Sequence, residues 1–187
     1  LDLDKENDSG GTALPGGTVG YTITVENSGS ETSWRNVLVD TLPDYMTDTD
    51  PSPTVAAELD GNPLTPGTDF TASMTGNQLT VDFTAGSGGP ISIPAGQTLV
   101  VTYTGTVSSQ VGAGAVLTNS AVADYNSWSD SDGRSYTTPP ATSSVTIHEA
   151  SVAKGHDAAG GLSAIGEPFT YTVDVTVPAH TTIYNAI

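Results

Sequence analysis

The sequence has 187 residues, with four Lys and Arg against 21 Asp and Glu, so its formal net charge is −17. This charge excludes a nucleic-acid partner, because phosphate neutralisation requires cationic side chains, and it opposes binding to an anionic membrane surface. The chain has no Cys, which excludes disulfides and thiolate metal sites, and no apolar run approaches the ~20 residues of a membrane-spanning helix. We therefore expect an extracellular protein without direct membrane insertion, and, since the chain lacks an initial Met, a piece of a longer protein.

Alternating apolar and polar residues predict a series of short β-strands. In chain order the alternation runs through residues 1–5, 21–26, 38–42, 79–83, 99–107, 117–123 and 145–147. Segments rich in Gly, Pro, Asn and Asp separate these runs, as turns do. The pattern predicts an all-β fold, an antiparallel immunoglobulin-like β-sandwich with Greek-key connections. A closed barrel is the alternative.

A short pattern occurs twice and predicts two structural repeats. Lys5 precedes a Gly-rich turn and the strand Tyr21-Thr22-Ile23, and Lys154 precedes a Gly turn and the strand Tyr171-Thr172-Val173. We expect a complete β-sandwich repeat over residues 1–148 and the N-terminal part of a second, truncated repeat over 149–187. Because no flexible spacer separates the copies, the junction predicts a stiff, rod-like array.

Three polar residues are predicted to point into the core. By alternation, Lys5, Asp40 and Asn119 each face the same way as the Leu or Ala residues two positions away. Burying a lone charged Lys or Asp is prohibitively costly, so such groups must pair, lose their charge or react. Lys occurs only twice, as Lys5 and Lys154, at the same position of the two repeats, so solubility does not explain either residue.

Beyond Lys5, three segments occur in one order: PGGTVGYTITVENSG at 15–29, NVLVDTLP at 36–43 and LTNSA at 117–121. This arrangement resembles the tandem conserved-repeat domain of bacterial and archaeal cell-surface proteins, which was long catalogued as a domain of unknown function. It is also similar to the isopeptide-forming domains of fimbrial pilins and adhesins. The resemblance covers residues 1–148 as a full copy and 149–187 as a partial one.

The resemblance implies an intramolecular amide between Lys5 and Asn119, formed autocatalytically with Asp40 as the proton shuttle. Burial would keep the Lys5 amine neutral and nucleophilic, and would keep the Asp40 carboxyl protonated. The alternative is a buried, unreacted Lys5–Asp40 ion pair with Asn119 hydrogen-bonded nearby. Lys154 corresponds to a second bond donor, but the counterpart of Asp40 would fall beyond Ile187, so no bond is expected there within this sequence.

The acidic loop after residue 123 is a candidate calcium site. Calcium takes about six to eight oxygen ligands, and the loop offers Asp124, Asn126, Asp130 and Asp132. The Glu that closes an EF-hand loop is missing, so the alternative is a solvated acidic loop. We expect no other cofactor.

Several further residues are weaker candidates for sites. A second acidic stretch contains Asp44, Asp48 and Asp50; His148, His156 and His180 lack metal-ligand spacing; Asn7-Asp8-Ser9 is a formal glycosylation sequon; Trp34 and Trp128 are either binding aromatics or packing residues. No nucleophile elbow supports hydrolysis, so we expect no enzyme beyond a single-turnover amide formation.

The leading functional hypothesis is a structural stalk or fibre repeat of an adhesin-like cell-surface protein, with neighbouring repeats of the same protein as partners. One alternative is an adhesin module that binds carbohydrate or protein, with calcium as a possible requirement. Such a module should show a loop-lined pocket rich in aromatic residues, and the sequence shows no aromatic cluster, which favours the stalk. Another is a subunit of an extracellular filament, completed by strands from a neighbouring chain.

Overall fold

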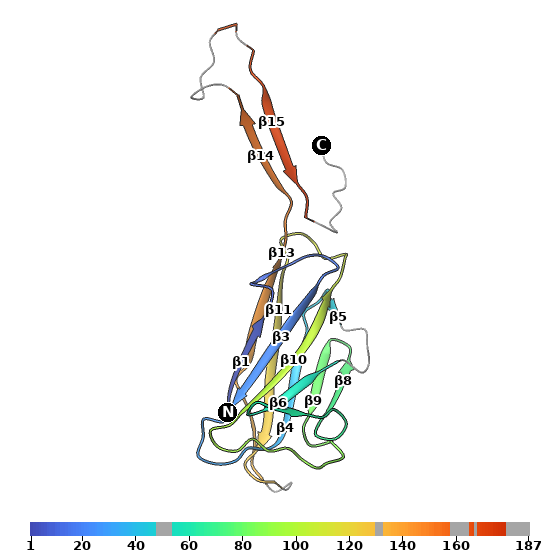
Figure 1. Ribbon diagram of the computed structural model, residues 1–187, viewed down its shortest axis with the longest axis vertical. Helices are drawn as coiled ribbons and strands as arrows, with labels where there is room; N and C mark the ends of the chain where they lie inside the picture. Colours follow the sequence, from blue (N-terminus) through green and yellow to red (C-terminus); the bar gives the residue numbers. More distant parts are fainter. Residues whose placement is uncertain (48–53, 130–132, 158–164, 167, 179–187) are drawn as a thin grey trace.

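The computed structural model describes residues 1–47, 54–129, 133–157, 165–166 and 168–178. Every regular element in these ranges is a β-strand, and two sheets pack face to face into an elongated sandwich (Figure 1). The predicted all-β, immunoglobulin-like class is confirmed. None of the described segments forms a helix with the length and hydrophobicity needed to span a bilayer.

The first sheet contains the strand that bears Lys5. Its order is β1 (Asp2–Asn7), β3 (Thr18–Glu26), β10 (Thr98–Val107), β6 (Ala56–Leu59) and β7 (Asn62–Leu64), with β5 (Met46–Thr47) paired to β10. All of these pairs are antiparallel. Central strand β3 is therefore hydrogen-bonded on both sides.

The second sheet contains the strands that bear Asp40 and Asn119. Its order is β2 (Thr12–Ala13), β13 (Ala141–Ile147), β11 (Val116–Asn126), β4 (Trp34–Thr41), β9 (Gln78–Asp82) and β8 (Thr71–Thr75), with β12 (Ser135–Thr137) paired to β11. Consecutive strands β3 and β4 lie in different sheets, and the later strand β10 returns beside β3, as in a Greek key.

One strand departs from the antiparallel prediction. Short strand β2 runs parallel to β13, with Thr12 opposite Thr146. Gly10 and Gly11 have φ angles of 64° and 85°, a left-handed conformation that glycine adopts without a steric cost. This turn takes the chain from β1 in the first sheet to the edge of the second.

The predicted alternation is visible as alternating burial. In β3 and β10 every second residue is buried between the sheets, and the inward side chains of both sheets form one apolar core. Burial of these apolar side chains is the main stabilising contribution in such a sandwich.

A two-stranded hairpin follows the sandwich. Strands β14 (Ser151–His156) and β15 (Tyr171–Thr176) pair with each other and project beyond the end of β13 (Figure 1). Every residue of both strands is exposed. The sheets of the sandwich end at Ile147, next to the predicted boundary, and the assignment of 149–187 to a second repeat stays a prediction.

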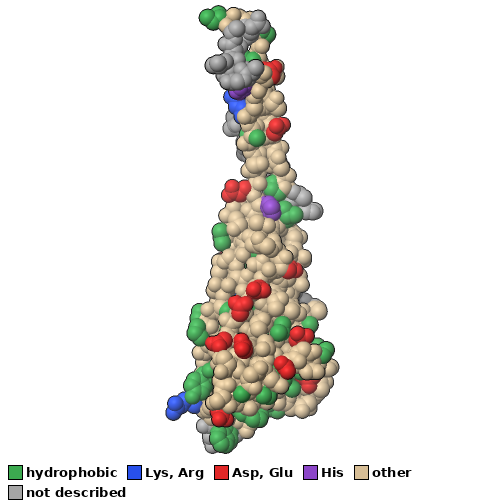
Figure 2. Space-filling view, turned by 60° about the vertical axis from the view of Figure 1, so that its left-hand side comes forward, with side chains coloured by type: hydrophobic (Ala, Val, Ile, Leu, Met, Phe, Trp, Pro, Cys, Tyr) green, Lys and Arg blue, Asp and Glu red, His purple; other side chains and the backbone are tan. Residues whose placement is uncertain are grey.

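The surface shown in Figure 2 reflects the acidic composition. Asp and Glu side chains are scattered over this face of the sandwich, whereas Lys and Arg side chains are seen near its lower end and on the hairpin. The visible face therefore presents no cluster of cations to a polyanion.

Candidate functional site

Lys5, Asp40 and Asn119 come from three strands, β1, β4 and β11, and lie inside the sandwich. Their exposed fractions are 4%, 0% and 0%. The inward orientation expected from alternation is therefore confirmed for all three residues. Lys5 belongs to the first sheet and the other two to the second, so the cluster joins the two sheets.

The register of the second sheet places Asp40 and Asn119 close together. Asp40 is opposite Ala121 on the neighbouring strand, and Ser120 is opposite Thr41. Asn119 and Ala121 share a face, so Asp40 and Asn119 are diagonal neighbours on it. Such neighbours are about 7–8 Å apart at Cα, within reach of polar side chains.

A tyrosine hydroxyl connects the three residues. Lys5 Nζ forms an ion pair with Asp40 Oδ2 and lies 3.4 Å from the Tyr103 hydroxyl, to which it donates. The Tyr103 hydroxyl donates to Asp40 Oδ2 at 2.7 Å, and Asn119 Nδ2 donates to the same hydroxyl at 2.6 Å. Tyr103 thus lies between the amine, the carboxyl and the carboxamide.

Two stacked aromatic rings cover the Lys5 amine. The rings of Tyr21 and Tyr103 stack with centroids 5.4 Å apart, and Lys5 Nζ lies 4.6 Å and 5.3 Å from these centroids. Aromatic faces attract a cation in a site without water. They also exclude solvent, which increases the cost of charging the amine.

Burial shifts the pKa values of the cluster toward neutral forms. Desolvation lowers the pKa of Lys5, with the Asp40 charge opposing it, and raises the pKa of Asp40, with Lys5 opposing it. Desolvation likewise raises the pKa of Tyr103 above its ordinary value, and that of Tyr21 to about 12. Both hydroxyls therefore remain protonated donors at neutral pH.

Two buried oxygens of the cluster have no hydrogen-bond partner. Among the described residues they are Asp40 Oδ1 and Asn119 Oδ1. An unpaired buried acceptor costs about 1–3 kcal/mol, and such atoms in a folded protein call for an explanation. Both belong to residues to which the family resemblance gives a role in amide formation.

The cluster has the components of an acyl transfer from a carboxamide to an amine. Lys5 offers a desolvated amine, Asn119 an electrophilic carbonyl, and Asp40 a carboxyl that exchanges protons. The sequence did not identify Tyr103 or Tyr21 as members. Both lie at inward positions of alternating strands, and that is the signal that could have indicated them.

The hairpin repeats the geometry around Lys5. In the first pair Lys5 is opposite Ile23, two residues beyond Tyr21, and in the hairpin Lys154 is opposite Val173, two residues beyond Tyr171. Lys154 Nζ lies 4.1 Å from the Tyr171 ring centroid, compared with 4.6 Å for Lys5 and Tyr21. The repeated pattern in the sequence thus corresponds to one repeated strand register.

The predicted calcium site remains a prediction. Asp124 accepts a hydrogen bond from Thr137, while Asp130 and Asp132 lie outside the described residues. In the parts of the chain that the structure describes, no group of three or more acidic or His side chains is arranged to hold a metal.

The remaining candidates are dispersed. Asp44, His148 and His156 are exposed, and Asp48, Asp50 and His180 lie outside the described ranges. The Asn7 amide of the sequon donates to Ser143 Oγ at 2.7 Å, so this side chain is engaged within the sandwich.

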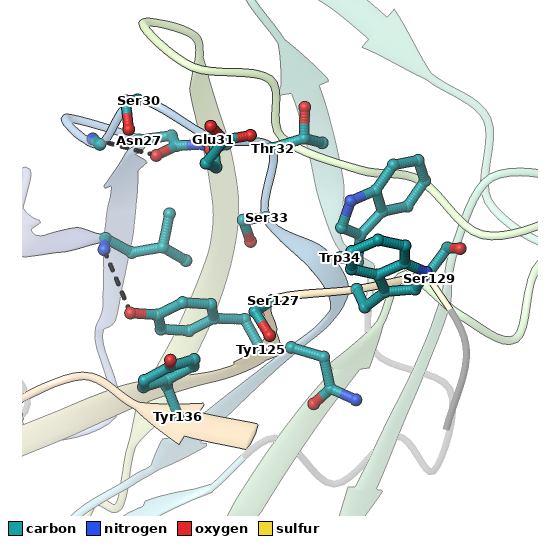
Figure 3. A pocket seen from close by; sticks show the side chains of 14 residues that line it. Asn27, Ser30, Glu31, Thr32, Ser33, Trp34, Tyr125, Ser127, Ser129 and Tyr136 are labelled. Carbon is teal, nitrogen blue, oxygen red and sulfur yellow. Dashed lines mark hydrogen bonds between the residues drawn. The ribbon is translucent and has the colours of Figure 1, made fainter. Parts of the chain in front are cut away.

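A groove at the end of the sandwich near Leu1 contradicts one expectation from the sequence. Trp34, Tyr125, Trp128 and Tyr136 line it together (Figure 3). The expectation that the chain has no aromatic cluster is wrong, because pairing of β4, β11 and β12 brings these distant residues to one end.

Comparison with known proteins identifies the fold. The chain is similar to the major pilin BcpA of Bacillus cereus, with a TM-score of 0.58 and 13% identity over 82% of this chain and 41% of that one. It is also similar to the major pilin SpaD of Corynebacterium diphtheriae, with a TM-score of 0.57 and 16% identity over 82% and 36% of the two chains. The chain is similar as well to the collagen-binding subdomain ACE19 of an Enterococcus faecalis surface protein. The TM-score is 0.50, and the identity is 15% over 77% of this chain and 95% of that one.

These similarities show that the chain has the β-sandwich fold of these pilins and of this surface-protein subdomain. The chain spans less than half of the length of either pilin. No protein-family model matches the sequence, and no curated protein does.

Proposed function

We propose that residues 1–148 form a stalk or fibre repeat of an extracellular surface protein, stiffened by an amide between Lys5 and Asn119. The observation that supports this proposal is the buried cluster in which the amine, the Asp40 carboxyl and the carboxamide meet around Tyr103. The fold shared with pilins and with the collagen-binding subdomain of a surface protein supports the extracellular, fibre-forming role.

The reaction begins with proton transfer within the ion pair. Lys5 passes a proton to Asp40, and the pKa shifts of both residues favour this neutral pair. The free amine then attacks Cγ of Asn119. A protonated Asp40 also supplies the kind of donor that the unpaired Asn119 oxygen lacks, and donation to this oxygen would stabilise its developing negative charge.

Collapse of the intermediate breaks the bond between Cγ and Nδ2. Asp40 passes the proton that it already holds to Nδ2, which leaves as ammonia. Asp40 then takes up the second hydrogen of the Lys5 nitrogen, which keeps one hydrogen in the new amide, so the carboxyl ends protonated. Tyr103 touches both Asp40 Oδ2 and Asn119 Nδ2, so its hydroxyl can relay the proton from the carboxyl to the leaving nitrogen. The reaction turns over once and is maturation of the protein, with no external substrate.

The proposed amide would connect the first strand of one sheet to a central strand of the other. Lys5 lies on edge strand β1, whereas Asn119 lies on β11 between β13 and β4. Tension applied at the N-terminal strand would then pass through a covalent bond to the second sheet. Without the bond, the same tension would act on the hydrogen bonds between β1 and β3.

The hairpin supports an array of such repeats. Its register and its Lys154–Tyr171 contact match those around Lys5, so we assign it to the first strands of a second repeat. Lys154 would be the amine of that repeat, and neighbouring repeats or further copies in a fibre would be its partners.

The intact mass of the denatured chain tests the proposal. Amide formation expels ammonia, so the mass should lie about 17 Da below the value calculated from the sequence, and Lys5→Ala should restore that value. Proteolysis followed by tandem mass spectrometry should yield a branched peptide that joins the Lys5 and Asn119 segments. A full mass in the folded protein would refute the amide and leave a buried ion pair.

A further inference from the structure

We propose that the groove lined by Trp34, Tyr125, Trp128 and Tyr136 binds a neutral oligosaccharide. Its volume is about 710 Å³, inside the range of roughly 300–1,000 Å³ typical of small-molecule sites. This inference is independent of the proposed amide, because the groove and the buried cluster share no residue.

The aromatic rings of the groove are available to a ligand. Trp128 is 64% exposed and Tyr136 is 40% exposed, and Tyr136 is held in place by stacking on Tyr125 with a centroid distance of 5.3 Å. Aromatic faces carry negative charge, which attracts the slightly positive C–H groups on the flat side of a sugar ring. Covering these rings also removes apolar surface from water.

The polar residues of the lining favour an uncharged ligand that is rich in hydroxyl groups. Figure 3 shows Thr32, Ser127, Ser129 and a carboxamide among the aromatic residues. Hydroxyl and carboxamide groups both donate and accept hydrogen bonds, as sugar hydroxyls require. The described lining contains the Glu31 carboxylate and no Lys or Arg, which disfavours sulfated or acidic sugars.

Hydrogen bonds hold described residues on both sides of the groove. The Asn27 side-chain amide donates to the carbonyl oxygens of Glu31 at 2.9 Å and Ile93 at 2.7 Å. On the other side, Ser127 N donates to the Arg134 carbonyl at 2.9 Å, and Arg134 N donates to Ser127 Oγ at 3.1 Å. Residues that are already held by hydrogen bonds lose little conformational entropy when a ligand binds.

A backbone irregularity lies next to the aromatic residues. The pairing of β4 with β11 shifts register here, so that Arg35 and Asn36 stand opposite Tyr125 as a β-bulge. Arg35, which follows Trp34, has a φ of 52°, a left-handed conformation that is costly for a residue with a side chain. Bulges redirect side chains, and retained strain of this kind is typical of binding sites.

An extended proline-rich peptide is the competing occupant of an aromatic groove. Such a peptide offers mainly backbone carbonyl groups, which would leave many of the hydroxyl and amide groups of this lining without a partner. The composition of the lining therefore favours the sugar, and the peptide is an outcome of the test.

Titration of the complete chain tests the inference. Tryptophan fluorescence and saturation-transfer NMR would be followed with neutral tetrasaccharides of glucose, N-acetylglucosamine, mannose and galactose. At least one should bind with a Kd below ~1 mM. Trp128→Ala and Tyr136→Ala should each weaken binding at least ~10-fold, with an unchanged unfolding temperature for the exposed Trp128.

A control variant separates this site from the rest of the molecule. Tyr45→Ala removes a tyrosine that is 55% exposed outside the groove, and it should bind the sugar as the parent does. The inference is overturned if no tetrasaccharide binds up to ~10 mM, if binding survives Trp128→Ala, or if a proline-rich decapeptide binds in the groove in place of the sugars.

Discussion

Replacement of Asn119 with Ala isolates the contribution of the proposed amide. The variant removes the carboxamide while Lys5, Asp40 and Tyr103 keep their mutual contacts. Its intact mass should equal the calculated value, whereas the parent should be about 17 Da lighter than calculated.

The size of the stability loss follows from the loop that the amide closes. Residues 5–119 form a loop of 115 residues, and closing a loop of this length lowers the entropy of the unfolded chain by an amount worth about 5 kcal/mol at 25 °C. At roughly 2–4 °C per kcal/mol for a domain of this size, the unfolding temperature should fall by roughly 10–20 °C.

Urea and thermal unfolding, followed by circular dichroism, measure this loss. The matched control is Ser120→Ala, one residue along the same strand on the opposite face, which should keep the mass deficit and change stability by less than ~0.5 kcal/mol. The reasoning would be refuted by a parent of full mass in which Asn119→Ala costs only about 1 kcal/mol.

Three further predictions concern the cluster and the hairpin. Tyr103→Phe should slow amide formation at least ~10-fold in refolding time courses monitored by mass, because the proton relay is lost; an unchanged rate would exclude the relay. In Lys5→Met, burial keeps the pKa of Asp40 raised with no opposing cation. The folded state then retains a proton that the unfolded chain releases above pH 3.8. The free energy of unfolding from urea titrations should therefore fall as pH rises toward the folded pKa, by up to about 1.4 kcal/mol per pH unit. The double variant Lys5→Met/Asp40→Asn should show no such fall in stability with pH. If Lys5→Met instead became more stable than the double variant as pH rises, the raised pKa of Asp40 would be contradicted. Truncation after Ala150 should change the free energy of unfolding of the sandwich by less than ~0.5 kcal/mol, because both hairpin strands are exposed; a larger loss would show that the hairpin packs on the sandwich.

Much of the cluster could be predicted from the sequence because side-chain direction in a strand is a local property. Successive residues point to opposite faces, so the apolar neighbours of Lys5, Asp40 and Asn119 were sufficient to predict that all three are buried. The same rule applies to Tyr21 and Tyr103, which lie at inward positions of alternating strands. The repeated Lys and Tyr pattern likewise corresponds to one strand register in both copies.

The tertiary structure decided which of these buried groups meet. Tyr103 contacts Asp40 and Asn119 because β10 packs across the core from β4 and β11, and sheet order and packing of this kind depend on contacts between segments far apart in the chain. The aromatic groove arose in the same way. Trp34 and Trp128 are far apart in the sequence. They line the same groove only because β4 pairs with β11 at that end of the sandwich. Alternation along a strand determines the face that a side chain takes, whereas its partners across the sandwich are determined by the packing of the whole sheet.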